Sequence, residues 1–210
     1  MKISGLKEYV YHELKKKLME GHIKQGERIW EEQIAEELGV SRTPVREAIN
    51  RLIAEGFVQN EPRKGIFAAE ISKEDLIKML DIRIVLEALS VDICCRKITD
   101  DEISELQKIY EEYTEKLTKK DFAKASQLDS RIHKFIAKVS ENLKLMEYIN
   151  DIQDFFTYTR TASVLWDDRK IKRSLEDHKE LVEAISEKNG EKAKLHIEKD
   201  IYAMKELLMG

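Results

Sequence analysis

The chain has 210 residues, of which 42% are hydrophobic and 37% are charged, and its formal net charge is −4 at pH 7. This hydrophobic content supports a folded core, and the length accommodates one large or two small domains. The sequence has no run of about 18 apolar residues and no apolar signal-peptide centre near its N-terminus, so neither a transmembrane helix nor secretion is predicted, and a cytoplasmic protein is expected. The mildly acidic balance argues against a general nucleic-acid coat.

The residues 39–51 predict a turn followed by a short, basic, amphipathic helix. Gly39 suits the left-handed end of a preceding helix, and Ser41 can cap the next one. The new helix has an apolar stripe at helical spacing, formed by Val45, Ala48, Ile49 and Leu52. Arg42, Thr43 and Arg46 fall outside that stripe. A packed helix with arginines and small polar groups at its N-terminal end is typical of helices that enter the DNA major groove.

The flanking segments extend this pattern to a winged helix-turn-helix. Ile34, Ala35 and Leu38 give the preceding helix an apolar face. Two extended runs follow at 57–60 and 66–69, and the Pro- and Gly-containing turn between them predicts a hairpin with a basic tip. The alternative is a small helical domain with surface arginines.

The run from Gly26 to Phe67 resembles the winged helix of the GntR family of bacterial transcription regulators. The resemblance is carried by Gln25-Gly26, by the unbroken run from Ile34 to Ile49, and by Leu52-Ile53-Ala54-Glu55-Gly56-Phe57-Val58. It implies binding of double-stranded DNA at a palindromic operator by a homodimer, with DNA contacts from Ser41, Arg42, Thr43 and Arg46 and, at the wing, from Arg63, Lys64 and Gly65. This chain has Glu32 where some members have an arginine, which leaves a phosphate contact at that position without its cation.

Two local charge clusters must supply the attraction to DNA, one formed by Arg42, Arg46 and Arg51 and the other by Arg63 and Lys64. The first 71 residues carry 12 basic and 12 acidic side chains, and the remainder carries 25 and 29. The DNA-binding half is therefore neutral overall. We expect binding that depends strongly on salt and that requires two half-sites.

The second half, residues 72–210, reads as helices only, and it joins residues 1–71 with almost no linker. Six helices are expected at about 72–96, 99–117, 121–140, 143–165, 172–187 and 191–208. Ser72 with Asp75 and Thr99 with Glu102 provide capping signals for the first two. The adjacent cysteines, Cys94 and Cys95, imply no disulfide framework and are expected on a buried helix face.

Polar residues interrupt three of these helical apolar stripes. Asp129 and His133 share one face of the third helix, His178 fills a gap in the fifth, and His196 borders the stripe of the sixth. An unpartnered buried carboxylate is costly, and a divalent metal would relieve that cost. Each residue taken alone could instead be an ordinary core residue with a hydrogen bond, and Asp129 could simply pair with His133. Spacing alone does not show that His178 and His196 converge.

Residues 75 to 205 resemble the FCD ligand-binding domain of the FadR-like branch of GntR regulators, in its shorter VanR-type form with six helices. The matching motifs are Arg83-x-x-x-Glu87, Asp129-x-x-x-His133, Ser140-Glu141-Asn142, His178-x-x-x-Val182 and the late His196. The resemblance implies that zinc or nickel binds to Asp129, His133, His178 and His196, and that a small carboxylate metabolite reaches the metal. Arg83 is the expected second contact of this effector, with Tyr158 and Arg160 as further candidates.

The sequence thus predicts a mainly α-helical fold, with an N-terminal winged helix-turn-helix and a C-terminal helical bundle. The expected function is that of a dimeric, metabolite-responsive repressor that has no enzymatic activity. Two alternatives stay open at this stage. A metal-dependent hydrolase could be attached to the DNA-binding domain, or the metal could be purely structural.

Overall fold

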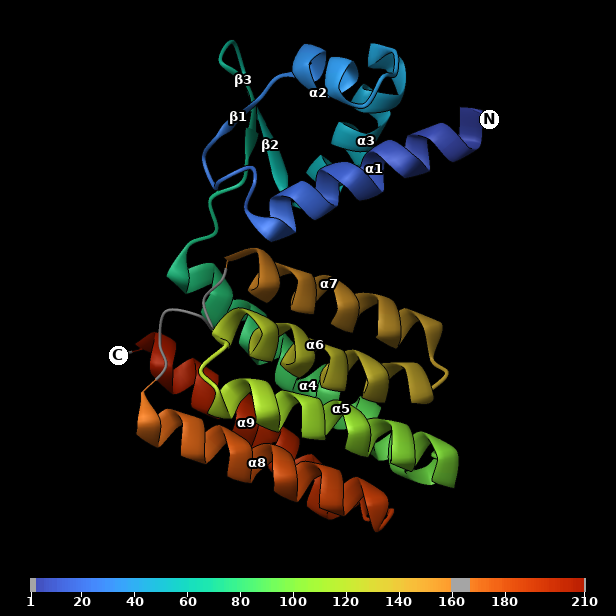
Figure 1. The fold of residues 1–210 in the computed structure, drawn as a ribbon, viewed down its shortest axis with the longest axis vertical. Helices are drawn as coiled ribbons and strands as arrows, with labels where there is room; N and C mark the ends of the chain where they lie inside the picture. Colours follow the sequence, from blue (N-terminus) through green and yellow to red (C-terminus); the bar gives the residue numbers. More distant parts are fainter. Residues whose placement is uncertain (1–2, 160–166, 210) are drawn as a thin grey trace. The chain divides into compact units, whose positions relative to one another are not determined.

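The computed structural model describes residues 3–159 and 167–209, and these residues fold mainly into α-helices, as predicted (Figure 1). The contacts within the chain divide it into two units, Met1–Ile71 and Ser72–Gly210. Arg160, one of the candidate effector contacts, lies outside the described residues.

The first unit is a winged helix-turn-helix, which confirms the prediction. It consists of α1 (Ile3–Glu20), β1 (Arg28–Ile29), α2 (Glu31–Glu37), α3 (Arg42–Ala54), β2 (Val58–Glu61) and β3 (Gly65–Ala68). The antiparallel sheet has the order β1-β3-β2, so Phe67 on the central strand is paired with Arg28 on one side and with Gln59 on the other. Neither α1 nor β1 was predicted from the sequence. Both complete the core, in which Leu14 of α1 and Leu52 of α3 are fully buried.

The turn between α2 and α3 orients the recognition helix. Gly39 has a φ of 65°, the left-handed conformation expected for it, and the N–H of Val40 donates to the carbonyl of Ala35 at 2.9 Å. Ser41 occupies the N-cap position of α3 but its side chain makes no capping hydrogen bond. Val45, Ala48, Ile49 and Leu52 are buried as predicted. The opposite, polar face of α3 is therefore the one presented to solvent.

The described part of the second unit forms six helices. They are α4 (Lys73–Lys97), α5 (Asp100–Thr118), α6 (Phe122–Val139), α7 (Leu143–Thr159), α8 (Asp168–Ser186) and α9 (Gly190–Met209). The predicted caps are confirmed: the Ser72 hydroxyl accepts from the N–H of Asp75, and Thr99 and Glu102 form a capping box. Helix α8 begins earlier than predicted because Asp167 caps it. The predicted end of α7 lies in the stretch that the structure does not describe.

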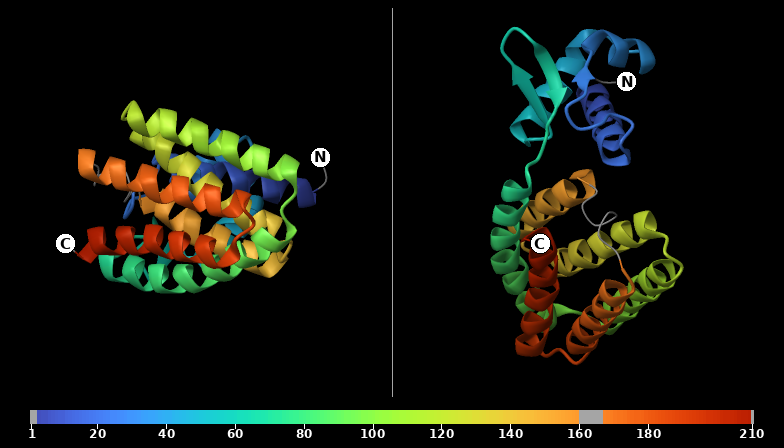
Figure 2. Two further views of the ribbon diagram at one scale, coloured as in Figure 1. Left: turned by 90° about the horizontal axis from the view of Figure 1, so that it is seen from below. Right: turned by 90° about the vertical axis from the view of Figure 1, so that its left-hand side faces the viewer.

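Within this unit, the long helix α4 packs along α9, and α9 packs in turn against α8 (Figure 2). Helix α5 lies against both α6 and α8, and α6 also contacts α4 and α7. Hydrophobic side chains fill most of the interior between these helices. The buried polar side chains, among them Arg83, Glu87, His133, His178 and His196, are exceptions that need partners.

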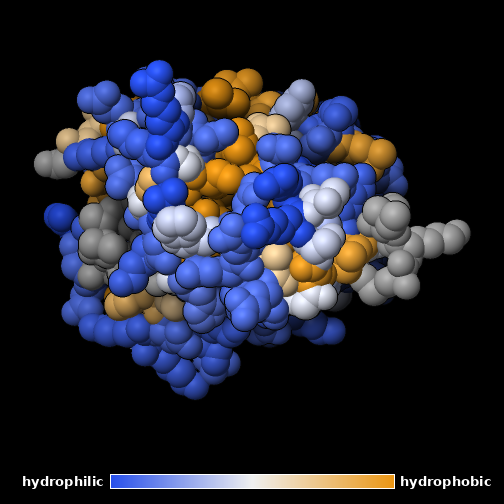
Figure 3. All heavy atoms as spheres, turned by 90° about the horizontal axis from the view of Figure 1, so that it is seen from above, coloured by the Kyte–Doolittle hydropathy of each residue, from blue (hydrophilic) through white to orange (hydrophobic). Residues whose placement is uncertain are grey.

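The surface agrees with the high charged fraction of the chain. The face drawn in Figure 3 is mainly hydrophilic, and its hydrophobic side chains gather in several patches, of which the most extended lies in the upper centre of the view. Among residues 3–159 and 167–209, no helix is long and apolar enough to cross a membrane.

Candidate metal centre and candidate nucleic-acid interface

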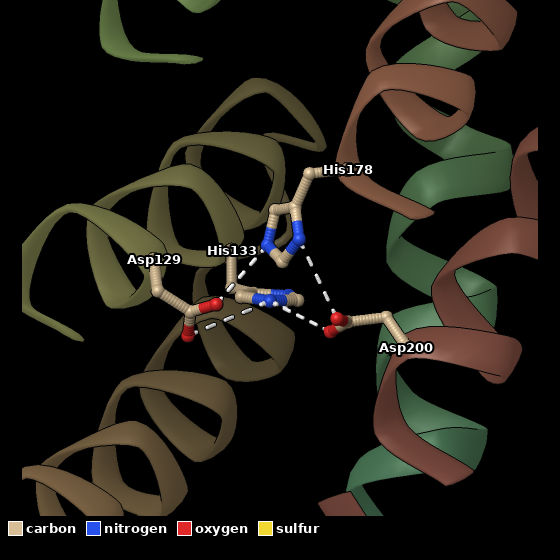
Figure 4. A group of neighbouring side chains, drawn as sticks. All are labelled: Asp129, His133, His178 and Asp200. Atoms are coloured by element: carbon tan, nitrogen blue, oxygen red, sulfur yellow. Dashed lines mark ion pairs between the residues drawn. The ribbon is translucent and has the colours of Figure 1, made fainter. Parts of the chain in front are cut away.

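Four side chains from three helices converge in the interior of the second unit. Asp129 and His133 project from α6, His178 projects from α8 and Asp200 projects from α9 (Figure 4). One ligand atom of each lies within 4.8 Å of the others. Because Asp129 and His133 are four residues apart, one helix face presents both toward the other two helices.

The distances place the imidazole nitrogens beside carboxylate oxygens. Nε2 of His178 lies 3.0 Å from Oδ1 of Asp129, and Nε2 of His133 lies 3.4 Å from Oδ2 of Asp200 and 4.0 Å from Oδ2 of Asp129. The two histidines are buried, whereas Asp129 and Asp200 keep 21% and 14% of their side-chain surface exposed. The donor set of two imidazoles and two carboxylates suits a borderline divalent cation such as zinc.

The hydrogen bonds of the two histidines leave Nε2 of each ring available. Nδ1 of His178 lies 3.0 Å from the carbonyl oxygen of Ser174, and a carbonyl only accepts, so Nδ1 carries the proton. Nδ1 of His133 likewise donates to Oε2 of Glu87. Both Nε2 atoms are buried and, among the described residues, make no hydrogen bond of good geometry; they lie at ion-pair distance from Asp129 and Asp200. Two ring nitrogens that face two carboxylates in this way fit a metal ion between them.

A buried hydrogen-bond network holds His133 at its Nδ1 atom, on the side of the ring away from the candidate metal centre. Oε1 of Glu87 accepts from Nε of Arg83 at 2.6 Å and from Nε2 of Gln153 at 3.0 Å, while Oε2 accepts from His133. Arg83, Glu87 and His133 are each only 1% exposed. The carboxylate of Glu87 therefore links the guanidinium of Arg83 to one of the candidate ligands.

The charges of this network shift the pKa values of its members. Burial raises the pKa of Glu87, but the charges of Arg83 and His133 outweigh burial and hold that pKa at about 2. Burial lowers the pKa of His133, but Glu87 outweighs it and raises that pKa to about 10. The pKa of Asp200 is lowered, since His178 and His133 outweigh the effect of its burial. Without a metal, the cluster thus retains protons on its imidazoles, and a metal would displace them.

The structure brings together three of the four metal ligands expected from the sequence and leaves His196 outside the group. Nδ1 of His196 lies 3.0 Å from Oε2 of Glu180 instead. Asp200, one helical turn further along α9, occupies the fourth position. Asp200 was not predicted from the sequence, although its spacing of four residues from His196 places it on the same helix face.

Two of the three candidate effector residues lie in described parts of the second unit. Arg83 is buried, its guanidinium lies 5.6 Å from the ring centroid of Phe156, and its Nη2 atom has no hydrogen-bond partner among the described residues. Tyr158 is a buried residue of α7. An unpaired guanidinium nitrogen is a suitable donor to a bound carboxylate.

The candidate nucleic-acid interface lies at the N-terminal end of α3 and at the wing. Ser41, Arg42, Thr43 and Arg46 are exposed there, as DNA contacts require. At the wing, Arg63 and Lys64 are exposed and Gly65 is half-buried. Gly65, the first residue of β3, has a φ of 120°, a backbone conformation that other residues rarely adopt, so this position favours glycine.

Carboxylates hold several of the cations on this unit. Nε of Arg46 donates to Glu31 at 2.7 Å, Arg42 pairs with Glu32 at 2.9 Å, and Lys64 pairs with Glu61 at 2.8 Å. None of these three ion pairs was predicted from the sequence.

Arg51 is also paired with carboxylates, but it is held against α1. Its guanidinium stacks on Tyr11 at 3.6 Å, and Nη1 lies 2.9 Å from Glu8. This arginine is therefore engaged in packing rather than presented with Arg42 and Arg46.

Comparisons with known proteins agree with both units. The gntR family of bacterial regulatory proteins matches residues 6–68, and the FCD domain family matches residues 78–202. The chain is 31% identical over 189 residues to YdhC of Bacillus subtilis, an uncharacterised HTH-type transcriptional regulator, over 89% of this chain and 84% of that protein. It is 25% identical over 181 residues to the gluconate operon transcriptional repressor of Bacillus licheniformis, over 84% and 74% of the two chains. The solved structure of McbR/YncC from E. coli shares the fold with a TM-score of 0.83, at 24% identity and over 97% of both chains.

Proposed function

The chain belongs to the GntR family of bacterial transcription regulators and carries an FCD effector-binding domain, and from this premise we propose that it is a repressor whose operator binding responds to a carboxylate effector at a metal centre. Its family and relatives are regulators rather than enzymes. The name of the gluconate operon repressor, one of its relatives, supports the sign of regulation. A site of action in the cytoplasm, where the DNA is, follows from this role.

We propose that residues 1–71 bind the operator through Ser41, Arg42, Thr43 and Arg46 of the recognition helix and through Arg63, Lys64 and Gly65 of the wing. The exposure of all of these residues except the half-buried Gly65, on one packed winged helix-turn-helix, carries this part of the proposal. The test is a gel shift with a duplex that the full chain selects from a random-sequence library. Arg46→Ala should abolish the shift while the circular dichroism spectrum stays unchanged. Unaltered affinity of this variant would refute the assignment.

We propose that the regulator acts as a homodimer on a palindromic operator. Helix α4 supports this, since it exposes a row of apolar side chains with relative exposures of 55% for Ile82, 68% for Val85 and 47% for Leu89. Their spacing of three and four residues places them on one helix face, and a contiguous apolar surface is typical of an interaction site. Sedimentation should give a dimer for the native chain and a monomer for Val85→Glu. A native monomer at the concentrations that bind DNA would contradict this arrangement.

We propose that zinc or nickel binds to Asp129, His133, His178 and Asp200. The observation that carries this is the convergence of two buried Nε2 atoms and two carboxylates, whose ligand atoms all lie within 4.8 Å of one another. The test is metal analysis of the purified chain by mass spectrometry. Asp200→Asn and His178→Ala should lose the metal. His196→Ala should keep it, because that ring lies beside Glu180. Stoichiometric metal in Asp200→Asn, or loss of the metal in His196→Ala, would overturn this ligand set.

We infer that the effector is a small carboxylate that reaches the metal and Arg83, with Tyr158 and Arg160 as further candidate contacts. The unpartnered Nη2 atom of the buried Arg83 supports this. Effector binding would change the affinity for DNA by favouring one arrangement of the dimer. A panel of mono- and dicarboxylates should include a compound that stabilises the native chain against heat but not Arg83→Met. If every stabilising compound acted equally on both, Arg83 would not be an effector contact.

The four-residue donor set also supports a second candidate, a structural metal, because four protein ligands suffice for a closed tetrahedral site. Cobalt substitution separates the two candidates. A weak absorption spectrum that changes on addition of the carboxylate indicates a higher coordination number with open positions, and it supports sensing. An intense tetrahedral spectrum that the carboxylate leaves unchanged supports the structural role.

A further inference from the structure

Arg46 is held by a carboxylate of the neighbouring helix. Its Nε atom donates to Oε2 of Glu31 at 2.7 Å, and the side chains are 59% and 22% exposed, respectively. The other donors of a guanidinium are on its two terminal nitrogens. The contact with Glu31 therefore fixes one edge of the guanidinium and leaves the opposite fork as the group that can meet DNA.

We propose that Glu31 is a positioning and specificity-determining residue, which orients the fork of Arg46 for bidentate recognition of a guanine. This inference rests on the proposed contact of Arg46 with the operator. Arginine reads guanine through two parallel hydrogen bonds to O6 and N7, and both form only when the plane of the guanidinium is correctly set. Glu31 would set that plane before DNA arrives.

The position of Glu31 suits this role. It is the first residue of α2, where the positive end of the helix dipole favours a carboxylate. The other ion pair at this surface is more exposed to solvent, since the side chains of Arg42 and Glu32 are 56% and 63% exposed. The smaller exposed fraction of Glu31 restricts its rotamers more than those of Glu32.

The carboxylate also affects DNA of the wrong sequence. Glu31 repels phosphates and competes with them for Arg46. It therefore lowers the affinity for DNA that has no guanine in position to accept hydrogen bonds from the guanidinium of Arg46. At the operator, the contact through Nε can persist while the fork binds the base. Glu31 thus raises the ratio of specific to non-specific affinity by both effects.

The experiment uses the full chain and a duplex that it selects from a random-sequence library. Affinities are measured for this duplex, for its single-base variants and for an unrelated duplex. Arg46→Ala first identifies the base position whose preference depends on Arg46. At that position, Glu31→Gln should reduce the preference for the selected base about tenfold, within the range expected for one bidentate contact. Its affinity for the unrelated duplex should rise.

Two further variants make the result specific. Glu36→Gln removes the same charge from an exposed position of α2 and should leave the base preference unchanged. In an Arg46→Lys background, which lacks the fork, Glu31→Gln should have no further effect on that preference. The positioning role is overturned if Glu31→Gln keeps the native preference, or if Glu36→Gln reduces it equally. If Arg46→Ala itself binds the operator normally, the proposed contact fails instead.

Discussion

Replacing Glu87 by glutamine tests whether the network behind the candidate metal centre acts as one unit. Glu87 accepts from Arg83, Gln153 and His133 with two carboxylate oxygens. A glutamine at this position has one acceptor oxygen and an amide group that only donates. The amide group of the glutamine then faces a donor, either Nδ1 of His133 or the donors of Arg83 and Gln153. The negative charge that balances Arg83 is also lost.

The size of the effect follows from burial. Arg83 and Glu87 are each 1% exposed, so the variant leaves an uncompensated charge in the interior. Removing one partner of a buried ion pair costs about 3–5 kcal/mol. Because Glu87 also orients His133 through Nδ1, we expect metal affinity to fall about 10- to 100-fold, the usual effect of losing such an outer partner.

Two assays separate these effects. Urea denaturation with excess chelator reports the free energy of unfolding of the metal-free chain, and competition with a chromophoric chelator reports metal affinity. Gln153→Leu is the matched control, since it removes one neutral donor to Glu87 and leaves Arg83 and His133 in place. This control should be destabilised less and should bind metal nearly as the native chain does. Native metal affinity in Glu87→Gln would refute the link through His133, and native stability would refute the cost assigned to Arg83.

Three further predictions follow from other contacts. In the metal-free chain, the free energy of unfolding should be greatest between pH 4.5 and 6.5. The lowered pKa of Glu87 gives stability that is lost as the pH falls from 4.5 towards 2, and the raised pKa of His133 gives stability that is lost as the pH rises from 6.5 towards 10. A flat profile of urea unfolding over these ranges would contradict both assignments. Burial raises the pKa of the Cys94 thiol to about 12 and that of Cys95 to about 11, so a thiol reagent at pH 8 should react with neither in the native chain and with both in urea. Rapid reaction of the native chain would show that this helix face is open. Thr99→Ala removes the capping box of α5 and should cost about 1 kcal/mol of stability. Thr118→Ala, at the other end of that helix, serves as the control, and equal unfolding midpoints for the two variants would argue against the cap.

Much of the fold could be predicted from local patterns. The recognition helix was readable because Gly39 and Ser41 mark its start and the apolar stripe to Leu52 defines its buried face. Strand β1 was not, because two residues are too short to show an alternating pattern. Its existence depends on pairing with Phe67 and Ile66, which lie almost 40 residues away in the sequence.

The candidate metal centre shows where the pattern stops being informative. Spacing of four residues places His196 and Asp200 on the same face of α9, and either could be a ligand. The choice depends on which turn of α9 lies level with His178 on α8. The packing of the two helices decides this, and it puts Asp200 at 3.5 Å from His178 and His196 beside Glu180. Glu87 could be singled out only as part of the motif Arg83-x-x-x-Glu87. Its contact with His133 could not be predicted, because the two residues lie on different helices and sequence spacing does not relate them.

The presence of Asp200 in place of a third histidine changes the charge that an effector would meet. With a divalent cation bound, the two carboxylates would balance its charge and Glu87 would balance Arg83, so the cluster would be formally neutral with its imidazoles uncharged. A set of one carboxylate and three imidazoles would carry one net positive charge. The proposed carboxylate effector would therefore gain less from long-range attraction here and would depend more on direct contacts, namely ligation of the metal and hydrogen bonding to Nη2 of Arg83. On this reasoning, the geometry of the guanidinium contributes more than the charge of the metal to selecting the effector, and Glu87, which fixes that guanidinium, becomes part of the selection.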